Sequence, residues 1–262
     1  YLGKFDDAIV EAKRINLKLN EINDKYAPDK KNRYTSDAFA LTLQGLLYEA
    51  MGDINNAFIS YRNAIDLYLK SDHKTYFGVP LPKSLEQDVL RTAKQLGFQN
   101  EYDFYKRKLN TSYSAPKLKS GGQLALIWEK GLVPYKDQTY FTFHMIPQNG
   151  VNMLDITNSE LGISIPIPVS SDQKKNSYDV FNVAFAKYQS RASYFTNAKI
   201  EVNSATYTFE EVEDYEFIAF KTLEDRRLRE VTNAATRLAT KCACIGIFVK
   251  SAGKTGAANI TC

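Results

Sequence analysis

Few residues in this chain could do metal or thiol chemistry, and they are scattered. His73 and His144 are the only two histidines, and neither has a neighbouring His or Cys at the spacing of a metal ligand. A zinc site brings three or four such ligands together, so we expect no metal site and no cofactor. The cysteines Cys242, Cys244 and Cys262 all lie near the end of the chain. We interpret them as small apolar side chains in preference to a redox or metal motif.

Two other patterns suggest chemistry but have simpler explanations. Gly253 to Thr255 reads GKT, yet the residue five positions before Gly253 is Phe248, whereas a phosphate-binding loop has glycine there. Acidic residues also cluster before a predicted helix, and catalytic carboxylate pairs need environments that separate their pKa values. The cluster consists of Glu210, Glu211, Glu213, Asp214 and Glu216. We interpret it as a solvated edge with a favourable charge near a helix N-terminus.

Composition limits the broad class of protein. A chain of 262 residues with 44% hydrophobic and 24% charged residues is typical of a globular protein, and its length predicts two domains. The net charge of +4 comes from basic and acidic residues interspersed along the chain, so it does not indicate nucleic-acid binding. No apolar run approaches the roughly 20 residues that span a bilayer. The 17 Tyr and 15 Phe suggest an envelope or extracellular β-domain.

The most regular stretch is AFALTLQGLLYEAMGDINNAFISYRNAIDLYL, from Ala38 to Leu69. Small and aromatic residues fall at the spacings of a tetratricopeptide (TPR) helical hairpin, in which two antiparallel helices pack through such positions. They are Gly45, Tyr48, Gly52, Ala57, Tyr61 and Ala64. Ser36 or Asp37 can cap the first of the two helices.

Similar helical periodicity flanks this hairpin. A helix is predicted over about Phe5 to Asn23, and a third helical pair over Ser84 to Leu96 and Glu101 to Leu109. Ser71 to Pro82 reads as a connector. About two and a half hairpins would share one continuous core, because each repeat packs on its neighbour. We assign residues 1–112 to this array, whose first repeat is truncated.

The pattern beyond residue 112 changes to the alternation of β-strands. Strands are predicted over Gln123–Trp128, Thr139–Met145, Gly162–Val169, Tyr178–Lys187, Ser193–Val202 and Thr206–Val212, with the prolines of Gly162–Val169 indicating a sheet edge. Helical spacing returns from Asp214 to Lys241, where an apolar stripe comprises Leu228, Val231, Ala235 and Leu238. The expected fold class is α+β: an N-terminal TPR-like helical hairpin array followed by a smaller mixed β-sheet domain, residues 113–262, with a long C-terminal helix.

Three stretches resemble a largely uncharacterised family of bacterial cell-envelope lipoproteins with TPR-like repeats and a C-terminal β-containing domain. They are YLGKFDDAIVEAKRIN, the hairpin ending in Ala57, Tyr61 and Ala64, and GQLALIWEKGLVPYK from Gly122 to Lys136. The final helix with Arg237 and Lys241 is also similar. The resemblance implies an exported, non-enzymatic protein of the periplasm, outer membrane or cell surface. It also implies a lipid anchor before Tyr1 as the one membrane attachment.

The expected function is a scaffold or adaptor that binds envelope proteins. On the helices, the concave surface would present Phe39, Thr42, Leu46 and Glu49; in the WEKGLVPYK turn, the contacts would be Trp128, Glu129 and Lys130. Those helical positions could instead pack within the array, and Trp128 could instead pack against helices. Three alternatives to an adaptor stay open: a homo-oligomeric subunit of a surface filament or assembly, an envelope glycan-binding protein whose tyrosines stack on sugars, and an enzyme with a dispersed site in the β-domain.

Overall fold

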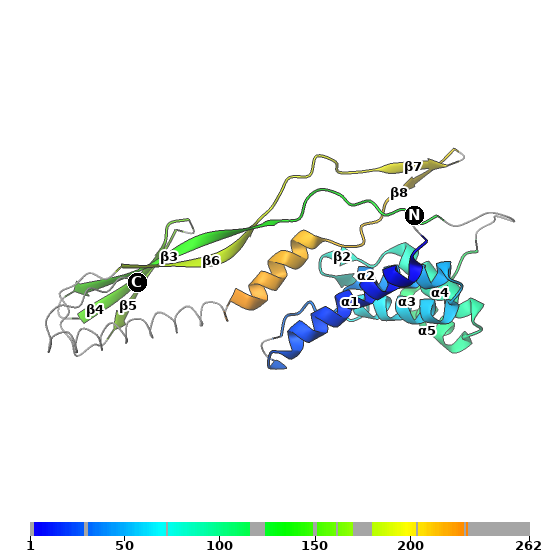
Figure 1. Cartoon of the computed structure of the whole chain (residues 1–262), viewed down its shortest axis with the longest axis horizontal. Coiled ribbons are helices and arrows are strands. Elements are labelled where there is room, and N and C mark those ends of the chain that lie inside the picture. The colour runs from blue at the N-terminus through cyan, green and yellow to red at the C-terminus, as the bar shows by residue number, and fades with distance from the viewer. Residues whose placement is uncertain are drawn as a thin grey trace. The chain divides into compact units, whose positions relative to one another are not determined.

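The structure is a computed structural model, and the fold that it shows is α+β (Figure 1). It describes residues 3–28, 31–71, 73–115, 124–148, 151–160, 162–169, 180–202, 204–227 and 229. Among these residues, five helices precede the larger sheet and a sixth helix begins at residue 215. The chain divides into two compact units, Tyr1–Pro134 with Ser190–Thr222 and Tyr135–Gln189 with Leu223–Cys262. The boundary predicted after residue 112 falls within the first unit.

The first unit is built on an array of helices in which each helix packs on the next. The helices are α1 (Phe5–Asp24), α2 (Ala38–Ala50), α3 (Ile54–Tyr68), α4 (Lys83–Gln95) and α5 (Gln99–Leu109). All five helical segments predicted from periodicity are therefore confirmed.

Asp37, one of the two predicted caps, lies immediately before helix α2 and caps its first turn. The Asp37 Oδ1 atom accepts a hydrogen bond from the Ala40 amide at 2.7 Å, which satisfies one of the free amides of the first turn. The Asp37 amide in turn donates to Asn16 Oδ1 of α1 at 2.6 Å. The side chain of Gln44 donates to the Ala12 carbonyl at 3.2 Å. These hydrogen bonds hold α1 against α2, because few large apolar residues lie between the two helices.

Helices α2 and α3 form the tightest contact of the array. Tyr61 is fully buried, and a Cβ atom placed on Gly45 would lie 2.3 Å from its ring. Ala57 and Ala64 are fully buried as well. Gly52, in the turn between the helices, has a positive φ of 80°, which glycine adopts at little cost. Small residues therefore let the two backbones approach closely around one large ring.

The connector between α3 and α4 contains a short hairpin that the sequence did not predict. Strand β1 (Thr75–Tyr76) pairs antiparallel with β2 (Val79–Pro80), and Gly78 in the turn has a φ of 86°. Val79 is buried, and the Tyr76 hydroxyl donates to the Ser36 carbonyl at 2.6 Å. Through these contacts the hairpin packs against the helical core.

Residues 124–134 belong to no helix or strand, so the predicted strand over Gln123–Trp128 is wrong for the described residues 124–128. Leu124 to Trp128 form a continuous apolar run, but no described strand pairs with it. Propensity alone does not form a strand, because the backbone must also find hydrogen-bonding partners.

The second unit is a four-stranded sheet in the order β5-β4-β3-β6 (Figure 1). Its strands are β3 (Tyr135–Gln148), β4 (Val151–Asn158), β5 (Ile163–Val169) and β6 (Val180–Gln189). The predictions for β3 and β6 are confirmed, and β5 lies at an edge as its prolines indicated. Strand β4 was not predicted. All described strand pairs are antiparallel, so the prediction of a mixed sheet is wrong.

A second hairpin lies in the first unit. Strand β7 (Lys199–Val202) pairs antiparallel with β8 (Ala205–Thr208), so the strands predicted over Ser193–Val202 and Thr206–Val212 are confirmed with shorter bounds. A helix follows over 215–227 and agrees with the start of the predicted C-terminal helix. The stripe from Leu228 to Leu238, the cysteines and the GKT sequence lie outside the described residues. Of the helices in the described ranges, none combines the length and apolar character needed to cross a membrane.

Candidate functional site

The four predicted groove residues all lie on α2, but most of them make contacts inside the array. Leu46 packs against the core, and the Thr42 hydroxyl donates to the Ala38 carbonyl at 2.9 Å. Phe39 lines a hollow described below. The Glu49 side chain is only 12% exposed and pairs with Arg91 of α4. Glu49 is therefore held by the array itself.

The Glu49 contact is part of a charged network across three helices. Arg91 Nη2 donates to Glu49 Oε2 at 2.8 Å and to Asp88 Oδ1 at 2.6 Å, and its Nη1 donates to Glu49 Oε1. The Tyr61 hydroxyl donates to Glu49 Oε2 at 2.8 Å. Burial raises the pKa of Asp88 even though Arg91 lies beside it. The network joins α2, α3 and α4 in a way that sequence spacing did not reveal.

A hollow in the first unit brings one of the clustered acidic residues among aromatic rings. Its cavity volume is about 10 Å³, room for about one water molecule, and its walls include Tyr34, Phe39, Tyr68, Tyr76, Phe77 and Val79. The Tyr34 hydroxyl donates to Glu213 Oε1 at 3.1 Å. The described lining contains no His, Cys, Lys or Arg side chain. The prediction that Glu213 lies at a solvated edge is therefore wrong, because its side chain lies among aromatic residues.

The carboxyl groups of the buried Asp37 and the half-buried Glu213 lie close together here. Burial, followed by the nearby Asp37 carboxylate, raises the pKa of Glu213 to about 7. Asp37 is 7% exposed, and the Glu213 Oε2 atom is buried with no hydrogen-bond partner in the described part of the chain. Burial also raises the pKa of Tyr76, to about 12, and that of Tyr34 still further. The protonated carboxyl is the form that this environment favours.

We expect the stability of the first unit to decrease as pH rises from about 5 to 8. Glu213 ionises near pH 4.5 when unfolded and near pH 7 when folded, so the folded state binds more protons between these values. The free energy of unfolding should fall by about 2 kcal/mol, allowing for partial solvent screening. Urea unfolding followed by circular dichroism at pH 5 and pH 8 measures the change.

The variants for this experiment separate Glu213 from other groups. Glu213→Gln should remove most of the pH dependence and stabilise the protein at pH 8. Glu210→Gln is the matched control, because Glu210 accepts hydrogen bonds from Ser84 at 3.0 and 3.1 Å but is exposed. An unchanged pH dependence in Glu213→Gln contradicts the assignment.

The other predicted contact residues lie on an exposed apolar arm, which we define as residues 124–134. The indole ring of Trp128 is half-buried and packs on Phe209 with centroids 5.6 Å apart. Glu129 and Lys130 are exposed. These three residues are consecutive in the chain, and Trp128 anchors the arm to the segment that follows β8.

Most other large side chains of the exposed apolar arm face solvent. The exposed fractions are 77% for Leu124, 47% for Leu126, 55% for Ile127, 68% for Leu132 and 59% for Val133. None of these residues was predicted as a contact, because the first three lie in a segment that was predicted to be a strand. Gly131 and Pro134 disfavour a regular strand, so these two residues were the sequence signal for an irregular, exposed segment.

A second extended segment of the first unit meets the exposed apolar arm. A Cβ atom placed on Gly131 would lie 3.3 Å from Ser193. The two residues that follow Ser193 are Tyr194 and Phe195, which are 94% and 73% exposed. Exposed apolar residues that gather in this way mark a site of protein or membrane contact more often than single exposed residues do.

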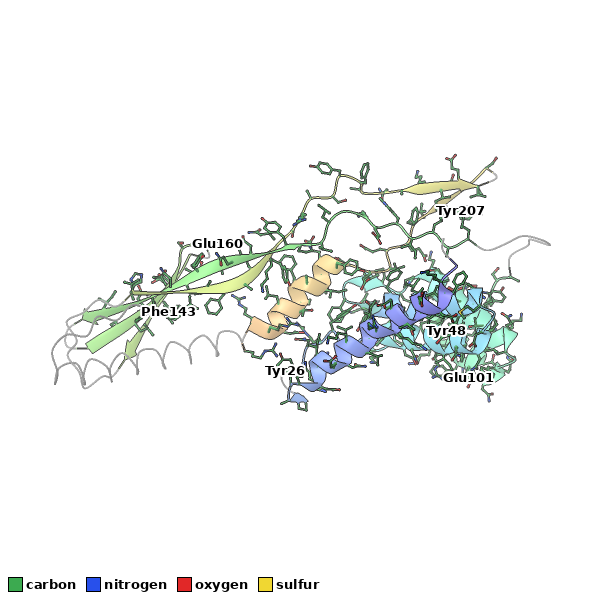
Figure 2. The ribbon with its side chains drawn as sticks, in the orientation of Figure 1. Tyr26, Tyr48, Glu101, Phe143, Glu160 and Tyr207 are labelled. Carbon is green, nitrogen blue, oxygen red and sulfur yellow. The ribbon has the colours of Figure 1, made fainter. Side chains whose placement is uncertain are left out.

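The described residues show no metal centre. His73 is exposed and His144 is half-buried on β3, and no group of three or more potential ligands occurs in the described ranges. In the second unit, Lys187 pairs with Asp137 at 3.6 Å and also with Glu160. Glu160 is labelled in Figure 2. Each of the two carboxylates in this group is therefore paired with Lys187.

Comparisons with protein families, with curated proteins and with solved structures find no match for this chain.

Proposed function

We propose that this protein is a non-enzymatic scaffold or adaptor of a bacterial cell envelope, and that the exposed apolar arm is its main contact with a protein partner. The observation that carries the proposal is the exposure of five large aliphatic side chains within eleven consecutive residues. Leaving such a surface in water is unfavourable by roughly 25 cal/mol per Å² of apolar area. A partner that covers the arm recovers this free energy.

The backbone of the arm supports the same proposal. Residues 124–130 lie outside every helix and strand, and no strand of the described chain pairs with them. An extended segment can place alternate side chains in an apolar groove while its backbone groups bond to the groove walls. Trp128 fixes the middle of the arm on Phe209, which reduces the conformational entropy lost on binding.

The helices supply a rigid base for the arm. Small residues pack around one buried ring between α2 and α3, as expected of a TPR-like hairpin. Arrays of such hairpins commonly hold other proteins. The resemblance of this hairpin and of the arm to envelope lipoproteins supports an exported location. In this proposal the α2 residues stabilise the array, and the arm makes the contact.

Photocrosslinking from Leu126 and from Leu132 tests the proposal. A photoreactive residue at either position, introduced in the source cells, should capture the same protein, and one at the exposed Lys199 of β7 should not. With that protein purified, Leu126→Ser combined with Leu132→Ser should weaken binding at least tenfold because two buried contacts are lost. Lys199→Ser should change affinity less than about twofold, as expected for a residue outside the contact.

Two results contradict the proposal. Undiminished affinity of the double variant for the purified protein excludes the arm as the contact. Turnover of a small substrate by the purified chain, without any protein captured from either position, excludes a non-enzymatic adaptor.

A subunit of a homo-oligomeric assembly is the second candidate function. Strand β6 is a sheet edge of ten residues without proline, whereas the opposite edge, β5, carries Pro166 and Pro168. Unprotected edges can pair with a strand of another chain. A molar mass above that of one chain in light scattering, over a range of concentrations, would favour this function over the adaptor.

A further inference from the structure

A short segment connects the exposed apolar arm to the hollow among the helices. We call residues 209–213 the linking segment. At its start, the Phe209 ring packs on Trp128 of the arm, with centroids 5.6 Å apart. At its end, Glu213 accepts a hydrogen bond from the Tyr34 hydroxyl at 3.1 Å. Both contacts lie within the first unit.

The linking segment is short enough to transmit a movement from one end to the other. Four residues separate Phe209 from Glu213, so even a fully extended backbone spans at most about 14 Å between them. The chain beyond Glu213 is fixed at once, because Asp214 Oδ1 accepts a hydrogen bond from the Phe217 amide at 2.9 Å at the start of the next helix. A movement of Glu213 therefore acts on Phe209 and, through it, on Trp128.

Protonation gives the Glu213 carboxyl group a further hydrogen-bond partner. Its Oε2 atom is buried and has no partner in the described part of the chain. The neighbouring Asp37 carboxylate caps α2 through Oδ1. Two ionised carboxylates can only accept hydrogen bonds, whereas a protonated one can donate to the other. Hydrogen bonding with Asp37 is accordingly one of the causes that raise the pKa of Glu213.

The groups around the pair leave its charge uncompensated. The titratable side chains that face Glu213 are the carboxyl groups of Asp37 and Asp214 and the hydroxyl groups of Tyr34, Tyr68, Tyr76 and Tyr215. Burial raises the pKa of each of these four tyrosines, so they stay neutral. Burial and then the Asp37 charge raise the pKa of Glu213 to about 7, against the smaller opposing effect of two tyrosine hydroxyls. Of these groups with a raised pKa, Glu213 is the one that ionises near neutral pH.

We propose that a proton shared by Glu213 and Asp37 latches the linking segment to α2 and thereby positions Trp128 in the exposed apolar arm. Loss of this proton to solvent leaves two like charges side by side in the hollow. Glu213 then turns toward water, and Phe209 moves off the indole ring. The inference deepens the proposed function, on which its last consequence rests: the arm binds its partner more tightly at pH 6 than at pH 8.

Tryptophan fluorescence of the full chain tests the latch without any partner. Trp128 is the single tryptophan, so its emission reports the anchored ring directly. We expect the emission to move to longer wavelength between pH 5 and pH 9, with a midpoint near the Glu213 pKa of about 7. Glu213→Gln should abolish the transition, because the amide can donate to Asp37 at every pH. Asp37→Asn keeps a good helix cap and removes the like charge, so the midpoint should fall by about one pH unit.

Two control variants separate the latch from other groups. Glu210→Gln changes an exposed carboxylate of the same linking segment, and His73→Gln removes an exposed side chain of the type that commonly titrates in this range. Both should keep the wild-type transition, and circular dichroism at pH 6 checks that each variant is folded. Absence of a transition in the wild type overturns the proposal. So does a transition that survives in Glu213→Gln or is lost equally in Glu210→Gln.

Binding at two pH values tests the regulation of the arm. The wild type should bind the protein captured from Leu126 and Leu132 about fivefold or more weakly at pH 8 than at pH 6, because the arm is no longer held in place. For Glu213→Gln the difference should be less than about twofold. Equal wild-type affinity at both pH values overturns the regulation. If the arm captures no protein, the proposed function fails, while the fluorescence transition still decides whether the latch exists.

Discussion

Replacing Arg91 with methionine should lower the free energy of unfolding of the first unit by about 3–5 kcal/mol, because it strands two buried carboxylates. Glu49 and Asp88 have side chains only 12% and 20% exposed, and Arg91 is the cation that pairs with both. Removing the guanidinium leaves both carboxylates without this cation, although the Tyr61 hydroxyl still donates to Glu49. Urea unfolding of the full chain, followed by helical circular dichroism, measures the loss.

The control variants separate stranded charge from lost packing. Arg91→Met with Glu49→Leu and Asp88→Leu should recover most of the lost stability, because an apolar replacement of a whole buried ion group is often nearly neutral. Arg14→Met is the surface comparison, since its pair with Glu11 is about two-thirds exposed and should contribute under about 1 kcal/mol. A loss below 1 kcal/mol for Arg91→Met contradicts the prediction.

Gly45→Ala should destabilise the same unit by about 3 kcal/mol, although alanine is the better helix former by about 1 kcal/mol in an exposed helix. The added Cβ would lie 2.3 to 2.6 Å from three atoms of the Tyr61 ring. Tyr61 is fully buried and its hydroxyl is held by Glu49, so the ring has no free space to enter. Thermal unfolding shows the sign directly.

A double-mutant cycle tests the cause of this loss. Gly45→Ala and Tyr61→Leu should be strongly non-additive, because the smaller side chain removes the clash. Ala50→Gly, at the exposed end of α2, gives the helix-propensity effect alone and should cost less than about 1 kcal/mol. Additive effects of Gly45→Ala and Tyr61→Leu contradict a steric origin.

The prediction of Gly45 as a helix-packing residue came from spacing alone, and so did the five helical segments. Helical periodicity is a local property: the apolar positions of α4, such as Leu85 and Val89, recur every three or four residues and are buried in the structure. Asp37 was identifiable as a cap for the same reason, because its partner is the Ala40 amide three residues away. Local contacts leave a readable signal in sequence.

Contacts between distant residues left no such signal. Glu49 was predicted as a free groove residue, yet its partner Arg91 lies 42 residues further along the chain. Glu213 was predicted at a solvated edge, yet it meets Tyr34 across 179 residues. In both cases the surroundings of the carboxyl group depended on packing that composition and spacing do not encode.

Taken by itself, the sequence determined the order of helices before strands, the positions of the small residues in the α2–α3 hairpin and the proline-protected edge β5. These features depend on local sterics and backbone conformation. The tertiary structure alone decided that residues 124–134 find no strand partner among the described residues, that Trp128 packs on Phe209 and that the aliphatic residues around Trp128 face solvent. A strand and an exposed arm can share one local pattern, because the difference lies in whether another backbone reaches the hydrogen-bonding groups.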